Sequence, residues 1–216
     1  MSHPDWLQPI VTAARQASIG ALARHTAPDG VEGRESAVLM LFGESPGTGP
    51  DVLLTERSHT LRSHAGQPAF PGGRIDPDDD GPVGAAIREA AEETGLDPSG
   101  VDVLAVLGEL WLPPSGYVVT PVLAWWREPS PVGVVDPAEV ASVHRIPLVD
   151  LVDPANRLRV RHPSGYVGPA FAVGGLTVWG FTAGILSALL DAAGMTRPWD
   201  RTRVEPLPMI TGAHRP

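Results

Sequence analysis

The sequence predicts an α+β fold in which helices cover both faces of a mixed β-sheet, as in an α/β/α sandwich. The first observation is the order of the elements, because strand patterns, one helix, more strand patterns and a last helix follow one another along the chain. That order lacks the regular strand–helix alternation of a doubly wound sheet. The second observation is size, since 216 residues with 43% apolar side chains suffice for one hydrophobic core and some added segments.

Three parts are expected along the chain. Residues 1–34 hold an N-terminal helix and a connector, residues 35–195 form the main domain, and residues 196–216 form an irregular C-terminal tail. Within the first part, the apolar spacing of residues 4–25 is that of an amphipathic helix with Pro4 near its start. The tail is rich in proline and arginine, which favours irregular structure.

Strand patterns lie on both sides of the first central helix. Apolar runs at residues 36–42 and 51–57 flank a Gly/Pro-rich turn, so a hairpin is predicted there. A polar loop over residues 58–68 follows, and residues 70–75 are expected to form a short strand or a turn. Further strands are predicted at residues 101–112, 118–126, 140–148, 158–163, 166–173 and 176–181.

The clearest helix covers residues 83–94. Its apolar side chains recur at the spacing of one helical face, and its acidic side chains lie on the other face. Pro82 suits the first turn of the helix, and Gly95 suits its C-terminal end. A second helix is predicted over residues 182–194, where Gly194 ends it.

Three glutamates crowd the polar face of the first helix. Glu89, Glu92 and Glu93 share an arc of roughly 100° on a helical wheel. Like charges at these spacings repel by about a few tenths of a kcal/mol per pair, so a counter-charge is expected. Arg88 supplies one positive charge, and Mg²⁺ or Mn²⁺, which prefers carboxylate oxygens, would supply two. The alternative is a solvated acidic face of the helix.

The overall charge and composition exclude several classes of protein. The net charge of −9 disfavours binding to nucleic acid, and the absence of cysteine leaves no disulfide framework. The first residues lack the pattern of a signal peptide, and the apolar runs fall short of the roughly 18 residues that a membrane span needs. We therefore expect a cytoplasmic protein without a membrane or nucleic-acid partner.

The segment from Gly72 to Leu96 resembles the Nudix box, G-x5-E-x7-R-E-U-x-E-E-x-G-U, in which U is apolar. The second half matches at every fixed position: Arg88, Glu89, Ala90, Glu92, Glu93, Gly95 and Leu96. The first half departs from the pattern, because Asp79 stands in place of the first glutamate and one extra residue separates it from Arg88. This departure leaves the role of Asp79 open.

The resemblance implies a Nudix hydrolase, with a metal-binding loop–helix–loop in an α/β/α sandwich. Such an enzyme hydrolyses a nucleoside diphosphate linked to another group and uses divalent cations. The resemblance implies Glu89, Glu92 and Glu93 as metal ligands, and Glu93, Glu89 and Arg88 as catalytic residues, with Arg88 orienting a carboxylate. The general base stays open between Glu93, Glu89 and a downstream acid, for which Glu139 is a candidate.

Residues 53–73 resemble the signature that precedes the box in the coenzyme A diphosphatase subfamily, L-L-T-x-R-[SA]-x3-R-x3-G-x3-F-P-G-G. The matching positions are Leu53, Leu54, Thr55, Arg57, Ser58, Arg62, Gly66, Phe70, Pro71, Gly72 and Gly73. Boxes of this subfamily commonly have the extra residue and the aspartate as well. The resemblance implies hydrolysis of the diphosphate of coenzyme A or acyl-CoA to 3′,5′-ADP and (acyl-)4′-phosphopantetheine.

The signature segment also suggests how the substrate is bound. Arg57 and Arg62 could bind phosphate groups bidentately, and Gly66 would allow a tight turn. Phe70 could pack beneath this loop or against adenine. The expected substrate-binding residues are Arg57, Arg62, Gly66, Phe70, Gly72, Gly73 and Arg74.

Two other functions remain open. The enzyme could act on another nucleotide derivative, such as ADP-ribose, NADH or a nucleoside triphosphate, or the chain could be a non-catalytic nucleotide-binding module. Partners are also open, because Arg197, Arg201 and Arg203 of the tail could contact the acidic body of the same chain or of a partner. A homodimer is a further open alternative.

Overall fold

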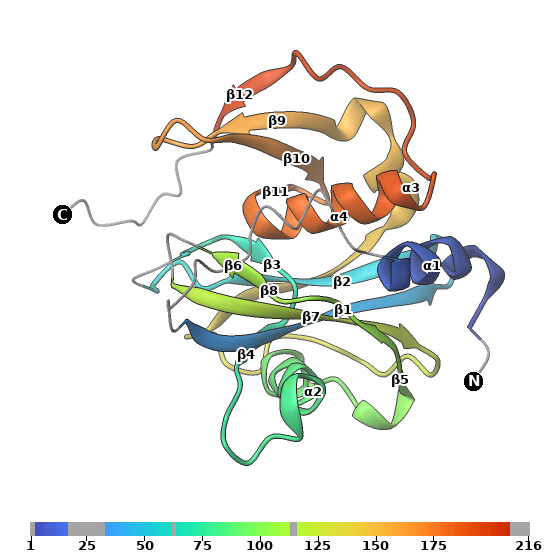
Figure 1. The fold of residues 1–216 in the computed structure, drawn as a ribbon, viewed down its shortest axis with the longest axis vertical. Helices are drawn as coiled ribbons and strands as arrows, with labels where there is room; N and C mark the ends of the chain where they lie inside the picture. The colour runs from blue at the N-terminus through green and yellow to red at the C-terminus, as the bar shows by residue number, and fades with distance from the viewer. Residues whose placement is uncertain (1–2, 17–32, 62–63, 113–115, 208–216) are drawn as a thin grey trace.

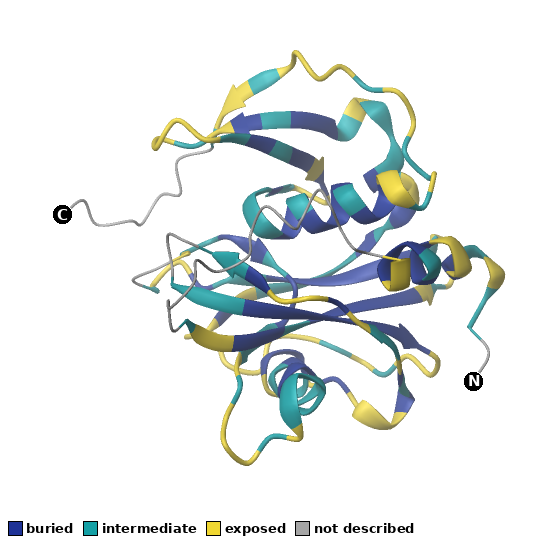
Figure 2. Ribbon diagram, viewed as in Figure 1, coloured by how far each residue is buried: buried dark blue, intermediate teal, exposed yellow. Residues whose placement is uncertain are grey.

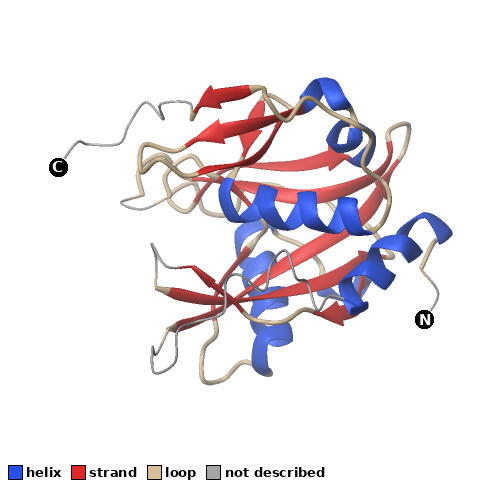
Figure 3. Cartoon of the chain, turned by 45° about the horizontal axis from the view of Figure 1, so that its top comes forward, coloured by secondary structure: helices blue, strands red, loops and turns tan. Residues whose placement is uncertain are grey.

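The computed structural model describes residues 3–16, 33–61, 64–112 and 116–207. A large sheet forms its centre, with α2 (Gly81–Thr94) on one face and α1 (Gln8–Gln16) and α4 (Gly180–Ala192) on the other (Figure 1). A second, smaller sheet lies beyond α4, so that α4 is between the two sheets (Figures 1 and 3). The predicted α/β/α arrangement is confirmed, and the small sheet adds a further layer.

The large sheet is built on the predicted hairpin. Strands β1 (Arg34–Ser45) and β2 (Gly49–Arg57) are antiparallel, whereas β7 (Tyr117–Trp126) is parallel to β1, which makes the sheet mixed. The strand order is β3-β2-β1-β7-β5, with β4 paired to β1, β6 to β7 and β8 to β2. The other strands are β3 (Pro68–Ala69), β4 (Gly72–Arg74), β5 (Val101–Val106), β6 (Leu110–Leu112) and β8 (Val140–Pro147).

Helix α2 lies close to the sheet because its inner face is made of small side chains. The helix begins at Gly81, slightly before the predicted start, and Pro82 is in its first turn. Gly95 ends the helix in the left-handed region with φ 72°, and its N–H donates to the carbonyl of Ala91 at 2.8 Å. The fully buried alanines of the helix are Ala85, Ala86 and Ala90. They pack with apolar side chains of β1, β2 and β7.

The opposite face of the sheet holds the larger core (Figure 2). A short 3-10 turn, Asp5–Leu7, precedes α1, and Leu7, Ile10 and Val11 are fully buried. The rest of the helix predicted over residues 4–25 lies outside the described residues beyond Gln16. Helix α4 begins at Gly180 and buries most of its side chains against both sheets. In the part of the chain that the structure describes, no helix is long and apolar enough to span a membrane.

The small sheet corrects the expectation for the C-terminal tail. Its order is β11-β10-β9-β12, and the sequence predicted only the first three of these strands. The strands are β9 (Arg157–Arg161), β10 (Val167–Val173), β11 (Leu176–Val178) and β12 (Val204–Pro206). Strand β12 is parallel to β9, and the N–H of Arg159 donates to the carbonyl of Arg203 at 2.9 Å. The tail is therefore not irregular throughout, because this edge of β9 supplies hydrogen bonds to it. The division of the chain at residues 34/35 and 195/196 stays a prediction.

Two short helical segments follow β8. Helix α3 (Leu148–Val152) and the 3-10 turn Pro154–Asn156 stand between β8 and β9. Helix α3 has only five residues, too few to show a helical period, so the sequence did not predict it.

Candidate active site

The three glutamates of α2 differ strongly in exposure. Glu93 is only 7% exposed and accepts a hydrogen bond at Oε2 from the backbone N–H of Gly72, at 3.2 Å. Glu89 is half-buried, whereas the side chain of Glu92 is 58% exposed. The helix thus has one buried, one half-buried and one exposed carboxylate, and the first two lie against the glycine pair of β4.

The glycine pair of β4 makes room for these carboxylates. A Cβ atom on Gly73 would lie 2.3 to 2.5 Å from the three atoms of the Glu89 carboxylate. A Cβ atom on Gly72 would lie 2.3 Å from the carbonyl oxygen of Ala37 on β1. Real Cβ atoms do not approach other atoms this closely, so only glycine lets β4 lie against both the helix and the sheet.

Arg88 uses all its guanidinium nitrogens to hold the site together. Its Nε and Nη2 donate to the two carboxylate oxygens of Asp79, at 2.8 and 2.9 Å. Its Nη1 donates to Glu89 at 3.1 Å and to Glu92 at 3.0 Å, while Nη2 also donates to the carbonyl of Arg74 at 3.1 Å. The bonds to Asp79 and Glu89 raise the pKa of Arg88, and the bond from Arg88 lowers the pKa of Asp79 to about 2.

Asp79 therefore has a defined place, which the sequence had left open. Its carboxylate anchors Arg88 and also accepts a hydrogen bond from the N–H of Asp76 at 2.8 Å. The sequence feature that pointed to Asp79 was its position in the box in place of the first glutamate, but spacing alone could not show which side chain its carboxylate would contact.

Burial and like charges raise the pKa of Glu93 to about 7. Burial is the largest cause, and the charges of Glu89 and Glu139 raise the pKa further. The hydrogen bond from Gly72 and the charge of Arg57 act in the opposite direction. The carboxyl group of Glu93 is thus close to several charges that come from different parts of the chain.

Glu89 is in a similar environment. Burial raises its pKa, and the charges of Glu92 and Glu139 add to the effect, whereas Arg88 opposes it. Glu139 is exposed and precedes β8, and its carbonyl accepts a hydrogen bond from the N–H of Ser58 at 2.8 Å. The downstream acid that the sequence singled out therefore acts electrostatically on both glutamates.

These carboxylates fit a divalent cation with oxygen ligands. Two acids with raised pKa values, Glu89 and Glu93, would both gain from a positive charge beside them. Mg²⁺ commonly takes one or two protein carboxylates and completes its shell with water and substrate phosphate. Among the described residues, no group of three or more acidic or histidine side chains is already arranged to hold a metal ion. Because Glu89 and Glu92 both accept hydrogen bonds from Arg88, the set of three glutamate ligands stays a prediction.

The signature segment reaches this site through Arg57. Arg57 ends β2, its charge acts on Glu93, and its buried Nε has no hydrogen-bond partner among the described residues. Gly66 adopts the left-handed region with φ 62°, and its N–H donates to the carbonyl of Arg57 at 2.9 Å. The expected tight turn is therefore present, and it closes back on Arg57.

The other expected substrate-binding residues divide into three cases. Phe70 is 3% exposed and belongs to the large core, which argues against the expected contact with adenine, and its packing beneath the loop stays a prediction. Arg74 has an exposed side chain, and its carbonyl is the group that binds Arg88. Arg62 lies outside the described residues.

Comparison with known proteins identifies the family. The model of the NUDIX domain matches residues 33–166 of this chain, which contain the signature segment, the glycine pair and α2. This chain belongs to the Nudix family. It is a Nudix hydrolase, a class that acts on nucleoside diphosphate derivatives and generally uses divalent metal ions.

Relatives and a solved structure agree with this assignment. The chain is 38% identical over 182 residues to a Nudix hydrolase of Shigella flexneri named NudL, with 76% of this chain and 84% of the relative covered. It is 39% identical to the NudL of Cronobacter sakazakii, with 72% and 81% covered. Both relatives are described as uncharacterized. The structure of RenU, a Nudix hydrolase from M. smegmatis, superposes with a TM-score of 0.53 at 20% identity and covers 78% of this chain and 90% of RenU, which shows the same fold.

Proposed function

We propose that this Nudix hydrolase cleaves the diphosphate bond of coenzyme A or acyl-CoA with Mg²⁺ or Mn²⁺, giving 3′,5′-ADP and (acyl-)4′-phosphopantetheine. The observation that supports this substrate most directly is the position of Arg57. It belongs to the segment that resembles the coenzyme A diphosphatase signature, and its charge acts on Glu93 of the box helix. Its buried Nε, without a partner among the described residues, is a donor that a phosphate oxygen could satisfy.

In this proposal Glu89 and Glu93 bind the cation, and Glu92 joins them when it leaves Arg88. A bound cation would neutralise charge on the diphosphate oxygens and activate a water molecule as the nucleophile. Arg88 is a positioning residue, because it holds Glu89 and Glu92 through Nη1 and is itself held by Asp79. The general base is one of Glu93, Glu89 and Glu139, whose charges interact.

Recognition of the substrate rests on the loop after β2. Coenzyme A has a diphosphate and a separate 3′-phosphate, so it needs cations at two places. Arg57 is beside the box helix, where the diphosphate would lie, and Arg62 is five residues further along the same loop. We therefore assign the diphosphate to Arg57 and the 3′-phosphate to Arg62. The exposed side chain of Arg74 is a further candidate for the diphosphate.

The nearest alternative keeps the reaction and changes the substrate to ADP-ribose or NADH. The box residues do not distinguish these substrates, because each has a diphosphate. A non-catalytic nucleotide-binding module is the other alternative, and the three intact glutamates of α2 argue against it.

The proposal is tested by mass spectrometry of the products formed from coenzyme A with excess Mg²⁺ or Mn²⁺, with Glu93→Gln as the control. We expect 3′,5′-ADP and phosphopantetheine from the natural protein and neither from the variant. Intact coenzyme A together with cleavage of ADP-ribose or NADH would retain the Nudix reaction and refute the substrate. No turnover of any of them with either metal would favour the binding module.

A further inference from the structure

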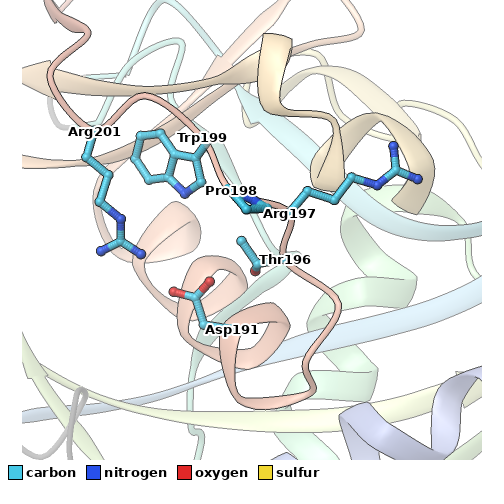
Figure 4. Close-up of a pocket in the computed structure, with 6 residues that line it drawn as sticks. All are labelled: Asp191, Thr196, Arg197, Pro198, Trp199 and Arg201. Carbon is cyan, nitrogen blue, oxygen red and sulfur yellow. The ribbon is translucent and has the colours of Figure 1, made fainter.

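A second candidate site lies at the end of α4, on the side of the large sheet opposite α2 (Figures 1 and 4). It is a pocket of about 450 Å³ lined by Asp191, Thr196, Arg197, Pro198, Trp199 and Arg201. These residues belong to the last turn of α4 and to the segment that leads to β12. None of them is part of the Nudix box or of the signature segment, so the proposed reaction gives them no role.

Two arginines contact the ring of Trp199. The Cζ atom of Arg157 lies 4.8 Å from the ring centroid, and the Cζ atom of Arg201 lies 5.4 Å from it. Arg157 is the first residue of β9 and is buried, whereas Arg201 is exposed and lines the pocket. The indole therefore brings two guanidinium groups close to one side of the pocket.

Arg157 is a buried cation with incomplete hydrogen bonding. It is 1% exposed, its Nη2 donates to Ser187 at 2.7 Å, and its Cζ lies 4.5 Å from the ring centroid of Phe171. Its Nε and Nη1 have no hydrogen-bond partner among the described residues. Burial lowers the pKa of Arg157, and the charge of Asp191 partly opposes this effect. Asp191 thus serves as an electrostatic partner for the buried arginine.

Two of the lining residues also present donors without partners. Within the described residues, the hydroxyl of Thr196 and the indole N–H of Trp199 are buried and make no hydrogen bond. Figure 4 shows both side chains and that of Arg201 around the same space, with the exposed Asp191 below them in this view and the guanidinium of Arg197 pointing away. No salt bridge to Arg197 or Arg201 is formed by the acidic side chains that the structure describes.

We propose that this pocket binds a small phosphorylated molecule that also has hydroxyl groups, of the sugar phosphate class. The exposed guanidinium of Arg201 supplies a charged donor at the edge of the space, and the hydroxyl of Thr196 and the indole N–H of Trp199 are two donors in its lining without partners among the described residues; a phosphate offers more oxygens than the two of a carboxylate. Asp191 can only accept hydrogen bonds when it is ionised, and a hydroxyl group of the same ligand would donate to it. The volume is in the range of small-molecule pockets.

The position of the ligand can be tested by NMR with ribose 5-phosphate as the probe. The protein is kept in EDTA so that the Nudix site has no metal. Its six tryptophans give indole N–H signals, and the signal lost in Trp199→Phe identifies Trp199. We expect the probe to shift the Trp199 signal in a saturable way. Saturable shifts confined to other indoles, or no saturable shift, would overturn the proposal.

Calorimetric titration tests whether Arg201 binds the phosphate of the ligand. This experiment does not depend on Trp199→Phe, so it still tests the proposal if that variant does not fold. Arg201→Gln should weaken binding of ribose 5-phosphate by about tenfold or more, since a hydrogen bond to a charged group is lost. The matched control is Arg161→Gln, which makes the same charge change at an exposed residue of β9 outside the pocket and should leave the affinity unchanged. Equal losses in both variants would mean that only the overall charge matters and would overturn the site.

Two simpler probes separate the groups of the ligand. Inorganic phosphate and ribose should each bind more weakly than ribose 5-phosphate. Asp191→Asn should tighten the binding of inorganic phosphate, because it removes the one carboxylate of the pocket lining. If ribose binds as tightly as ribose 5-phosphate, the phosphate assignment is wrong. If inorganic phosphate binds as tightly as ribose 5-phosphate, the hydroxyl assignment is wrong.

Discussion

Arg88 and Asp79 form a two-point ion pair, with Nε 2.8 Å from Oδ1 and Nη2 2.9 Å from Oδ2. This pair explains how the box tolerates its departure from the usual pattern. An aspartate is shorter than the usual glutamate, and the one additional residue before Arg88 gives the loop the length to bring the carboxylate to the guanidinium. A turn from Asp76 to Asp79, closed by an N–H···O bond of 3.0 Å, sets the direction of that loop.

Removing the charge of Asp79 should impair the site through Arg88. In Asp79→Asn the two-point pair is lost, so Arg88 holds Glu89 and Glu92 less firmly. Loss of such an outer partner commonly lowers metal affinity or activity by about 10- to 100-fold. We expect kcat/KM to fall in this range and the Mg²⁺ concentration for half-maximal activity to rise. Asp76→Asn is the control, because Asp76 is exposed and lies 3.7 Å from Arg88. Equal activity of the two variants would refute the anchoring role.

The space at Gly73 gives a second prediction. In Gly73→Ala the new methyl group would meet the Glu89 carboxylate at 2.3 Å, so the carboxylate must move away from its place. We expect weaker Mn²⁺ binding, measured by calorimetry, and a loss of activity that high Mn²⁺ partly restores. Gly184→Ala is the control, because a Cβ atom there meets nothing within 4 Å and α4 should gain about 0.5–1 kcal/mol of stability. Unchanged metal affinity in Gly73→Ala would show that Glu89 is not a ligand.

The raised pKa of Glu93 predicts how the metal-free protein depends on pH. The pKa of Glu93 is about 7 in the fold, compared with 4.5 for a glutamate in water, so the folded state holds the proton more tightly. This contribution to stability is fully present below pH 4.5 and is lost as the pH rises through 7, where ionised Glu93 destabilises the fold. The difference amounts to about 3–4 kcal/mol, since the two pKa values differ by about 2.5 and one pKa unit corresponds to about 1.4 kcal/mol.

Glu93→Gln should therefore be more stable than the natural protein at pH 8 in EDTA, by about 1–3 kcal/mol, although we expect it to be inactive. The advantage should disappear near pH 4.5 and with saturating Mg²⁺ at pH 8. Urea denaturation under these conditions measures the difference in the free energy of unfolding between the variant and the natural protein. Glu92→Gln is the control, because Glu92 is an exposed acid of the same helix. A stability difference that does not change with pH would contradict the prediction.

The sequence predicted most of the fold because the strong patterns are local. The hairpin of β1 and β2, the helix that Pro82 and Gly95 delimit, and α4 all follow from apolar spacing and turn residues. Strand β12 could not be predicted, because its three residues become a strand only through pairing with β9, which is distant in sequence. Helix α3 has five residues, fewer than two helical turns, and so gives no period.

The site was predictable in its composition and less so in its contacts. Motif spacing brought Glu89, Glu93 and Arg57 forward, and the structure places the charges of all three together. Motif spacing could not show that Glu92 is bonded to Arg88, because helical spacing fixes the face on which a side chain lies and not its partner. The pocket beside Trp199 had no motif at all, since Arg157 and Arg201 meet there only through the tertiary fold.

The last prediction separates the two arginines of the signature loop by the phosphate that each binds. The charge of Arg57 acts on Glu93, so we expect Arg57 to contact the diphosphate, and Arg57→Gln should lower kcat/KM alike for coenzyme A and for dephospho-coenzyme A, which lacks the 3′-phosphate. Arg62→Gln should lower it for coenzyme A alone, by about tenfold or more, because a charge-assisted hydrogen bond is typically stabilising by about 1.5–3 kcal/mol. For each variant, the ratio of kcat/KM for coenzyme A to kcat/KM for dephospho-coenzyme A measures how strongly the 3′-phosphate contributes. Both values come from one enzyme preparation, so errors in active-site concentration cancel. If Arg62→Gln leaves this ratio unchanged, Arg62 does not read the 3′-phosphate, and a substrate without that group, such as ADP-ribose, becomes the better candidate.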